Sequence, residues 1–185
     1  MLRVGLTGGI GSGKSTVARR VRDLLLERGD RTLTMLDGDV VRRLLSSGLG
    51  FGRADRETNV RRIGYVAAEA ARHGGIALCA PIAPYAATRA DLRRMAAAAG
   101  AGFVLVHVAT PLEECERRDR KGLYAKARAG EIAEFTGISD PYEEPDDADL
   151  RLDTTDVAVD DAAGQVLTLL AERGWLSTVP ASSFG

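Results

Sequence analysis

The sequence predicts an α/β fold in which helices cover both faces of a parallel, five-stranded sheet. Two observations lead to this prediction. Short apolar runs alternate with helical patterns along the whole chain, as parallel strands joined by helical crossovers require. One of these runs, Ile76–Ala80, is apolar throughout, which is typical of a strand buried on both faces. A doubly wound sheet of this kind places its ligand site at the carboxyl ends of the strands.

Five apolar segments, bounded by turn-forming residues, are predicted as the strands of this sheet. In chain order they are Leu2–Thr7, Arg31–Leu36, Ile76–Ala80, Phe103–Val108 and the short Leu150–Asp153.

Apolar residues at helical spacing lie between the predicted strands. The first helix begins at Ser15 and ends before Gly29, which suits a helix C-terminus. Thr88 is expected to cap a later helix, and Pro111 to occupy the first helical position of the next. The predicted helices are Ser15–Arg28, one or two turns within Val40–Leu45, Asp55–His73, Arg89–Ala99, Pro111–Arg118 and Asp161–Arg173.

The composition bounds the function. A chain of 185 residues is long enough for one domain with its own core. The formal net charge is −1, which argues against a general binder of nucleic acid or membrane surfaces. The apolar runs fall short of the roughly 18 residues that span a bilayer, and residues 1–7 lack the pattern of a secretory signal. Cys79 and Cys115 match neither a disulfide framework nor a zinc pattern, so we expect reduced thiols and a cytoplasmic protein.

The domain is expected to cover residues 1–175, with a loose tail over 176–185 that is rich in Ser and Pro. The segment from Asp119 to Asp149 fits no strand, and its charges change from basic to acidic along the chain. A stretch of this length outside the sheet is typical of a functional lid.

Residues Gly8–Ser15 read GGIGSGKS and match the phosphate-loop pattern G-x-x-x-x-G-K-[ST] in full, between a predicted strand and a predicted helix. Glycines allow successive backbone N–H groups to point at an anion, and the start of the helix adds its positive end. Lys14 is expected to reach the β- and γ-phosphates of a nucleoside triphosphate, and the Ser15 hydroxyl to bind Mg²⁺. The predicted ATP-binding residues are Gly8, Gly9, Gly11, Ser12, Gly13, Lys14, Ser15 and Thr16.

Two carboxylates, Asp37 and Asp39, follow the second predicted strand. The third strand runs into Ala80–Pro84 without an acid, so the aspartate that usually orients the metal there is missing. One of the two carboxylates would orient the Mg²⁺ shell and the other would accept a proton from a substrate hydroxyl. We favour Asp37 at the metal and Asp39 as the base. The alternative is that one of them only caps the next helix.

Arg56 and Asn59 are three residues apart and share one helix face. Because guanidinium binds phosphate or sulfate through parallel hydrogen bonds, this pair suits an anionic acceptor. Arg61 and Arg62 are expected on a solvated face. Phe51, in a glycine-rich loop, either stacks on a base or plugs the core.

Several blocks, in order over residues 4–173, resemble the adenylylsulfate (APS) kinase family. They are Gly8–Ser15, Leu36–Arg42, Leu49–Phe51, Asp55–Ile63, Ile82–Tyr85, Arg117–Tyr124, Lys126–Gly130 and Phe135–Ile138. The residues around Ala80–Pro84 and His107–Pro111 are most similar to kinase domains that are fused to ATP sulfurylase.

The resemblance implies transfer of the γ-phosphate of ATP, with Mg²⁺, to the 3′-hydroxyl of APS. The products are 3′-phosphoadenylylsulfate (PAPS) and ADP, in sulfate assimilation. It implies catalytic roles for Lys14, Asp39 and Lys121, with Lys121 close to the transferred phosphate. It implies that Phe135 closes over the APS adenine opposite Phe51. The implied APS site is Asp37, Gly38, Asp39, Arg42, Phe51, Arg56, Asn59, Ile82, Ala83, Lys121 and Phe135.

The resemblance further implies a lid over residues 119–138 that excludes water, a homodimer, and fusion or association with an ATP sulfurylase. Ala83 departs from the family, because many members carry serine there; without a hydroxyl the transfer must be direct. The opening, Gly5–Lys14, is more similar to dephospho-coenzyme A kinases. Two alternatives follow: a kinase of another small anionic acceptor, such as dephospho-coenzyme A or an antibiotic, and a nucleotide-binding domain without catalysis.

Overall fold

The computed structural model describes residues 2–29, 32–119 and 122–176. Five strands form one sheet in the order β2-β3-β1-β4-β5, and every neighbouring pair is parallel. The predicted five-stranded parallel sheet is therefore confirmed. The strands are β1 (Leu2–Thr7), β2 (Leu33–Asp37), β3 (Ile76–Ala80), β4 (Gly102–Val108) and β5 (Leu150–Leu152).

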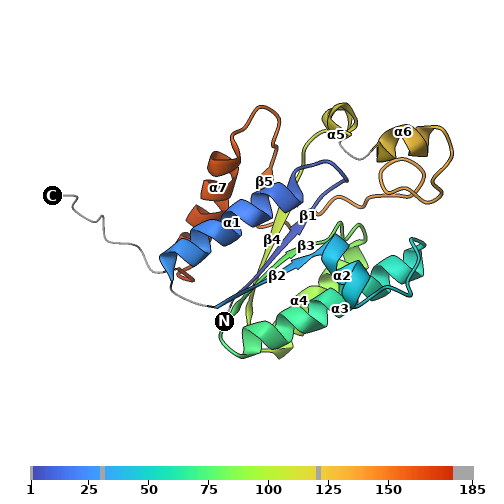
Figure 1. The fold of residues 1–185 in the computed structure, drawn as a ribbon. Helices are drawn as coiled ribbons and strands as arrows, with labels where there is room; N and C mark the ends of the chain where they lie inside the picture. The colour runs from blue at the N-terminus through green and yellow to red at the C-terminus, as the bar shows by residue number, and fades with distance from the viewer. Residues whose placement is uncertain (1, 30–31, 120–121, 177–185) are drawn as a thin grey trace.

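Helices cover both faces of the sheet, as predicted. The pair α1 and α7 packs on one face, and α3 and α4 pack together on the other (Figure 1). The helices are α1 (Lys14–Arg28), α2 (Gly38–Leu44), α3 (Arg53–Arg72), α4 (Ala86–Ala98), α5 (Leu112–Arg118), α6 (Leu123–Arg128) and α7 (Val159–Glu172).

The side chains of β3 explain why its sequence is apolar without interruption. Ile76, Leu78 and Ala80 join the cluster that packs under α1 and α7. Ala77 and Cys79 point the other way and join the cluster under α3. Because both faces are covered, every residue of this strand is buried.

The start of α4 differs from the prediction. The helix begins at Ala86 rather than Arg89, and Thr88 lies buried inside it instead of capping it. The cap comes from another part of the chain: the Glu143 carboxylate accepts a hydrogen bond of 2.6 Å from the Ala86 N–H, although the two residues are 57 positions apart. Local sequence cannot show such a cap.

Two further expectations are corrected or fall outside the described residues. Pro111 immediately precedes α5 rather than forming its first residue. Of the expected tail, only Leu176 is described, and its side chain is buried.

The segment after α5 contains the short helix α6 and a tight turn with a bridge between Thr136 and Asp140. Among the described residues, no helix combines the length and apolar character needed to cross a membrane.

Candidate active site

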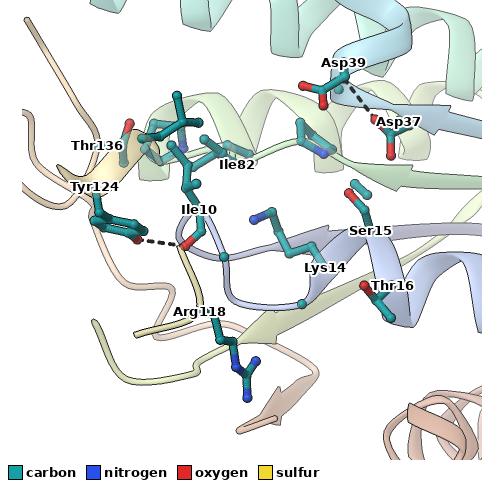
Figure 2. Close-up of a pocket in the computed structure, with 18 of the residues that line it drawn as sticks. Ile10, Lys14, Ser15, Thr16, Asp37, Asp39, Ile82, Arg118, Tyr124 and Thr136 are labelled. Carbon is teal, nitrogen blue, oxygen red and sulfur yellow. Dashed lines mark hydrogen bonds between the residues drawn. The ribbon is translucent and has the colours of Figure 1, made fainter. Parts of the chain in front are cut away.

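One cavity of about 1350 Å³ lies at the carboxyl ends of the central strands and is lined by the phosphate loop, α2, α3 and the segment after α5, whose Tyr124 lies beside the loop (Figure 2). Most of the predicted site residues line it. They are Gly11, Gly13, Lys14, Ser15, Thr16, Asp37, Gly38, Asp39, Arg42, Phe51, Arg56, Asn59, Ile82, Ala83 and Phe135.

Three predicted nucleotide-binding residues, Gly8, Gly9 and Ser12, do not line the cavity; they shape the loop from behind. Gly8 has a φ of +149°, and a Cβ there would lie 2.4 Å from the Val108 carbonyl oxygen, so no other residue fits. Ser12 is fully buried. The predicted catalytic Lys121 lies outside the described residues.

The carbonyl groups of the phosphate loop are held by side chains. The Lys14 ammonium donates a hydrogen bond of 2.6 Å to the Gly9 carbonyl. The Tyr124 hydroxyl, from α6, donates one of 2.7 Å to the Ile10 carbonyl (Figure 2). With these acceptors satisfied, the polar groups that the loop retains for a ligand are mainly backbone N–H groups, which suit phosphate.

Sequence reasoning missed a pair of threonines that completes this support. The Ser12 carbonyl accepts hydrogen bonds of 3.0 Å from the hydroxyls of both Thr110 and Thr154. Each threonine lies just beyond the carboxyl end of a strand, β4 or β5. The rule that drew attention to the end of β2 therefore applies to these strands also, and would have identified both residues.

Lys14 is buried at the centre of the cavity. Burial lowers its pKa to about 8, and the nearby Cys115, Asp37 and Asp39 oppose part of that shift. A cation in this position is poorly solvated, so a polyphosphate beside it would be a favourable partner.

Asp37 ends β2 and Asp39 lies in the first turn of α2, both across the cavity from Lys14 (Figure 2). Asp37 caps α2, because its Oδ1 accepts a 3.0 Å hydrogen bond from the Asp39 N–H. Asp37 therefore does cap the helix, and the metal role predicted for it stays a prediction. Since β3 lies between β1 and β2, the end of β2 is set off from the loop strand by roughly 10 Å, two strand spacings. That gap leaves room for a transferring group.

The Ser15 hydroxyl and the Asp37 carboxylate line the same cavity and supply the hard oxygen ligands that Mg²⁺ prefers. Within the described ranges no group of three or more His, Cys, Asp or Glu side chains is arranged to hold a metal. Mg²⁺ is commonly bound by one or two protein groups together with substrate phosphates, so these residues fit it.

Arg42 and Phe51 form one wall of the far half of the cavity. The Arg42 guanidinium lies 4.3 Å from the centre of the Phe51 ring and donates a 2.7 Å hydrogen bond to the Gly50 carbonyl. Phe51 is 64 % exposed, so the expectation that it plugs the core is wrong. Burial, followed by the neighbouring charge of Arg56, lowers the pKa of Arg42. An anion between the two arginines would relieve that repulsion.

Asn59 and Arg56 project from α3 into the cavity, as their spacing predicts. Asn59 is buried, and its Oδ1 has no hydrogen-bond partner among the described residues. A buried acceptor without a partner is a place where a ligand donor fits. Arg56 is bound by the loop that follows α6, through Asp140 at 2.7 Å. Arg61, by contrast, is paired with carboxylates on the outer surface, as expected.

Phe135 also lines the cavity, but only 3 % of it is exposed. Its ring packs edge-to-face on Tyr124, with 5.0 Å between the centroids, within a small cluster that includes Cys115 and Ala127. Most of the Phe135 surface therefore packs within this cluster, and its closure over a base opposite Phe51 stays a prediction.

Ala83 lies on the cavity wall after β3 with a φ of +46°, a left-handed conformation that is uncommon outside glycine. Two buried side chains hold it there. Arg89 donates a 2.9 Å hydrogen bond to the Ala83 carbonyl, and the Thr7 hydroxyl donates to the carbonyl of Ile82.

Arg118 also lines the cavity. No role was predicted for it, although it lies in Arg117–Tyr124, one of the blocks that carry the family resemblance. It sits on the side of the phosphate loop away from Asp37 and Asp39 (Figure 2). Its guanidinium donates to the Thr154 hydroxyl and carbonyl, both at 2.8 Å. Together with Arg117 it lowers the pKa of Glu114 to about 2, so Glu114 is a permanent anion that fixes Arg118.

A parallel sheet whose first strand leads into a phosphate loop, with a second, arginine-lined half of the cavity beside it, defines a P-loop nucleotide-binding fold with space for a second anionic ligand. Comparisons with known proteins specify the family. The adenylylsulphate kinase family matches residues 2–153, so this chain belongs to that family.

Individual relatives agree with the assignment. The APS kinase CysC of Mycobacterium tuberculosis, solved with AMPPNP and APS, is 49 % identical, with a TM-score of 0.88 over 92 % of this chain and 97 % of that one. A hexameric APS kinase from Thiobacillus denitrificans is 44 % identical, with a TM-score of 0.74 over 95 % of this chain and 29 % of that one. The sulfate adenylyltransferase of Aspergillus terreus is 47 % identical over 92 % of this chain. The chain spans only 30 % of the length of that curated relative.

Proposed function

We propose that this protein phosphorylates APS at its 3′-hydroxyl with ATP, giving PAPS and ADP. One observation carries the proposal: a single cavity joins the phosphate loop to the pair Arg42 and Arg56 and to the exposed ring of Phe51. Its volume of about 1350 Å³ exceeds the roughly 300–1,000 Å³ typical of a site for one small ligand. The cavity therefore has room for two nucleotides.

ATP would bind with its phosphates in the loop, facing the N–H groups and Lys14. Since the far half of the cavity is the acceptor side, the base of ATP must lie at the other end. Arg118 and Val157 line that end. A guanidinium plane and an aliphatic side chain are suitable surfaces for an adenine ring.

APS would bind in the far half of the cavity. Arg42 and Arg56 would hold its phosphosulfate through charge-assisted hydrogen bonds. The Asn59 Oδ1 would accept a hydrogen bond from a hydroxyl or amino group of APS. Phe51, exposed and supported by Arg42, would stack on its adenine, a contact worth roughly 1–3 kcal/mol per base. The proposed contribution of Phe135 to the same base requires the lid segment to change its packing.

The chemistry would be direct, in-line transfer. The bond between the γ-phosphorus and the β,γ-bridging oxygen breaks, and a bond to the 3′-oxygen of APS forms. Asp39 would accept the hydroxyl proton, and Lys14 would offset negative charge on the phosphates. Mg²⁺, held by Ser15 and Asp37, would neutralise charge on the β- and γ-phosphates. Ala83 has no nucleophile, so the protein carries no phosphate on this wall.

The lid proposed over residues 119–138 would close the cavity against water. Tyr124 supports this role, because its hydroxyl already binds the phosphate loop at Ile10. The Asp119 carboxylate, which accepts from two N–H groups at the start of α6, sets the position of that helix. The approach of Lys121 to the transferred phosphate stays a prediction.

Transfer of label from γ-labelled ATP, with APS compared against dephospho-coenzyme A, tests the proposed function. We expect labelled PAPS with APS and no labelled product with dephospho-coenzyme A. Product from dephospho-coenzyme A alone would identify a kinase of another acceptor. Tight APS binding without product would identify a nucleotide-binding domain without catalysis.

We also retain the homodimer, the association with an ATP sulfurylase and the cytoplasmic location as predictions. The sulfate adenylyltransferase relatives, of which this chain covers less than a third, support the second of these. Chromatography of the protein alone and mixed with an ATP sulfurylase tests the first two.

A further inference from the structure

Arg56 is held in place by the loop of residues 134–140. Its Nη1 donates a 2.7 Å hydrogen bond to Oδ2 of Asp140 and a second bond to the Thr136 hydroxyl. Its Nη2 donates to the carbonyl of Glu134. The Arg56 and Asp140 side chains are only 12 % and 14 % exposed, so their ion pair is better shielded from water than a surface pair.

Asp140 is also held by a residue outside α3 and outside its own loop. The same Oδ2 accepts a 2.8 Å hydrogen bond from the hydroxyl of Tyr85, a buried residue that directly precedes α4. The backbone around Asp140 is a tight turn: its N–H donates to the Phe135 carbonyl at 3.0 Å, and its carbonyl accepts from the Gly137 N–H at 2.8 Å. One carboxylate oxygen therefore joins α3, the start of α4 and the turn.

This arrangement leaves part of Arg56 for a ligand. A guanidinium has five N–H donors, and the contacts to Asp140, Thr136 and Glu134 use three of them. No described residue accepts from Nε of Arg56, and Arg56 lines the cavity. A flexible arginine would lose side-chain freedom on every binding event, whereas one already fixed loses little, so the bound acceptor is more stable.

We propose that Asp140 and Tyr85 are positioning residues of the acceptor site, which hold the Arg56 guanidinium so that its remaining N–H groups meet the anionic part of the acceptor. The proposal rests on the proposed function, in which that anionic part is the phosphosulfate of APS. Asp140 and Tyr85 act through Arg56 and need not touch the acceptor.

The test measures the KM for APS and the KM for ATP in Asp140→Ala, with APS affinity measured separately by calorimetry. We expect the KM for APS to rise about tenfold, the rotamer freedom of one arginine, while the KM for ATP changes less than about twofold. Tyr85→Phe keeps the buried ring and removes only the hydroxyl, so it should raise the KM for APS about threefold and fold normally. In an Arg56→Ala background, Asp140→Ala should add no further increase.

Asp147→Ala is the matched control, because it removes another ion pair between this part of the chain and a helix, Arg93–Asp147 at 2.9 Å. It should leave both KM values unchanged.

An unchanged or lowered KM for APS in Asp140→Ala overturns the inference. An effect of Asp140→Ala that persists in the Arg56→Ala background overturns it also. Failure of the unmodified protein to bind APS overturns the proposed function together with the inference. Normal APS binding with insensitive variants overturns the inference alone.

Discussion

The proposed phosphate site at one end of the cavity comes from one contiguous stretch, Gly8–Ser15, whereas the proposed acceptor end is assembled from segments far apart in the chain. The first would bind phosphate through backbone N–H groups and one lysine. The second depends on the side chains of α2, α3, the loop after β3 and the turn at 134–140. A site built from a contiguous loop can be recognised by its spacing. A site built from scattered side chains exists only when the whole fold holds them together.

The largest effect is expected from Lys14→Ala. Removing the cation that faces the phosphates should lower turnover by about a thousandfold, because a preorganised charge is lost from the reacting group. Calorimetry should still detect APS binding, since the acceptor half of the cavity is unchanged. Lys126→Ala, on the exposed surface of α6, is the control and should retain full turnover. Near-normal turnover of Lys14→Ala would contradict the role of the loop.

Two single substitutions, one at each end of the cavity, should each raise the KM for a different substrate. Arg56→Ala is expected to raise the KM for APS by about 10- to 100-fold and to change that for ATP little, because a charged hydrogen-bond donor is lost only from the acceptor side. Arg118→Ala should do the reverse, raising the KM for ATP about tenfold. Steady-state kinetics with each substrate varied in turn measures both.

Arg62→Ala provides the control for this pair, since Arg62 lies on the same helix as Arg56 and outside the cavity. It should alter neither KM. Equal effects of Arg56→Ala on both substrates would mean that the two ends are not independent.

The use of ATP and the binding of APS should also differ in their dependence on pH. Burial lowers the pKa of Lys14 to about 8, so the free protein loses this positive charge as the pH rises through that value. Because ATP requires the protonated amine, kcat/KM for ATP should fall above about pH 8. The affinity for APS, measured by calorimetry without ATP, should not follow the same curve. A profile for ATP that stays flat to pH 9 would contradict this role of Lys14.

The smallest expected effect is on stability, at the start of α4, where the Glu143 side chain caps the helix. Glu143→Ala removes the cap from the Ala86 N–H and should lower the free energy of unfolding by about 1 kcal/mol, or Tm by about 2–4 °C. Thermal denaturation measures the change. Glu144→Ala, at a neighbouring position that is exposed and pairs with Arg151 at 3.3 Å, should leave Tm nearly unchanged. Equal losses in the two variants would rule out the cap.

Much of the fold and of the site could be predicted because the signals are local. The parallel sheet follows from alternating apolar patterns, and the phosphate loop follows from eight adjacent residues. Even Arg56 and Asn59 were found by their helical spacing. Their positions on α3 require no knowledge of the rest of the molecule.

Contacts between distant segments could not be predicted in this way. Glu143 caps α4 from 57 residues away, and Asp140 meets Arg56 across 84 positions and Tyr85 across 55. The sequence around each of these residues gives no indication of the distant residue that it contacts. Phe135 was expected to close over the APS adenine, and its burial against Tyr124 depends on how α6 packs on the phosphate loop.

The sequence by itself determined the order of strands and helices and the site for phosphate, because backbone geometry and periodic burial are properties of short stretches. Only the tertiary structure decided which side chains hold the acceptor half in place. Those side chains act through direct hydrogen bonds and ion pairs, and such contacts form only where folding brings distant segments within about 3 Å of one another.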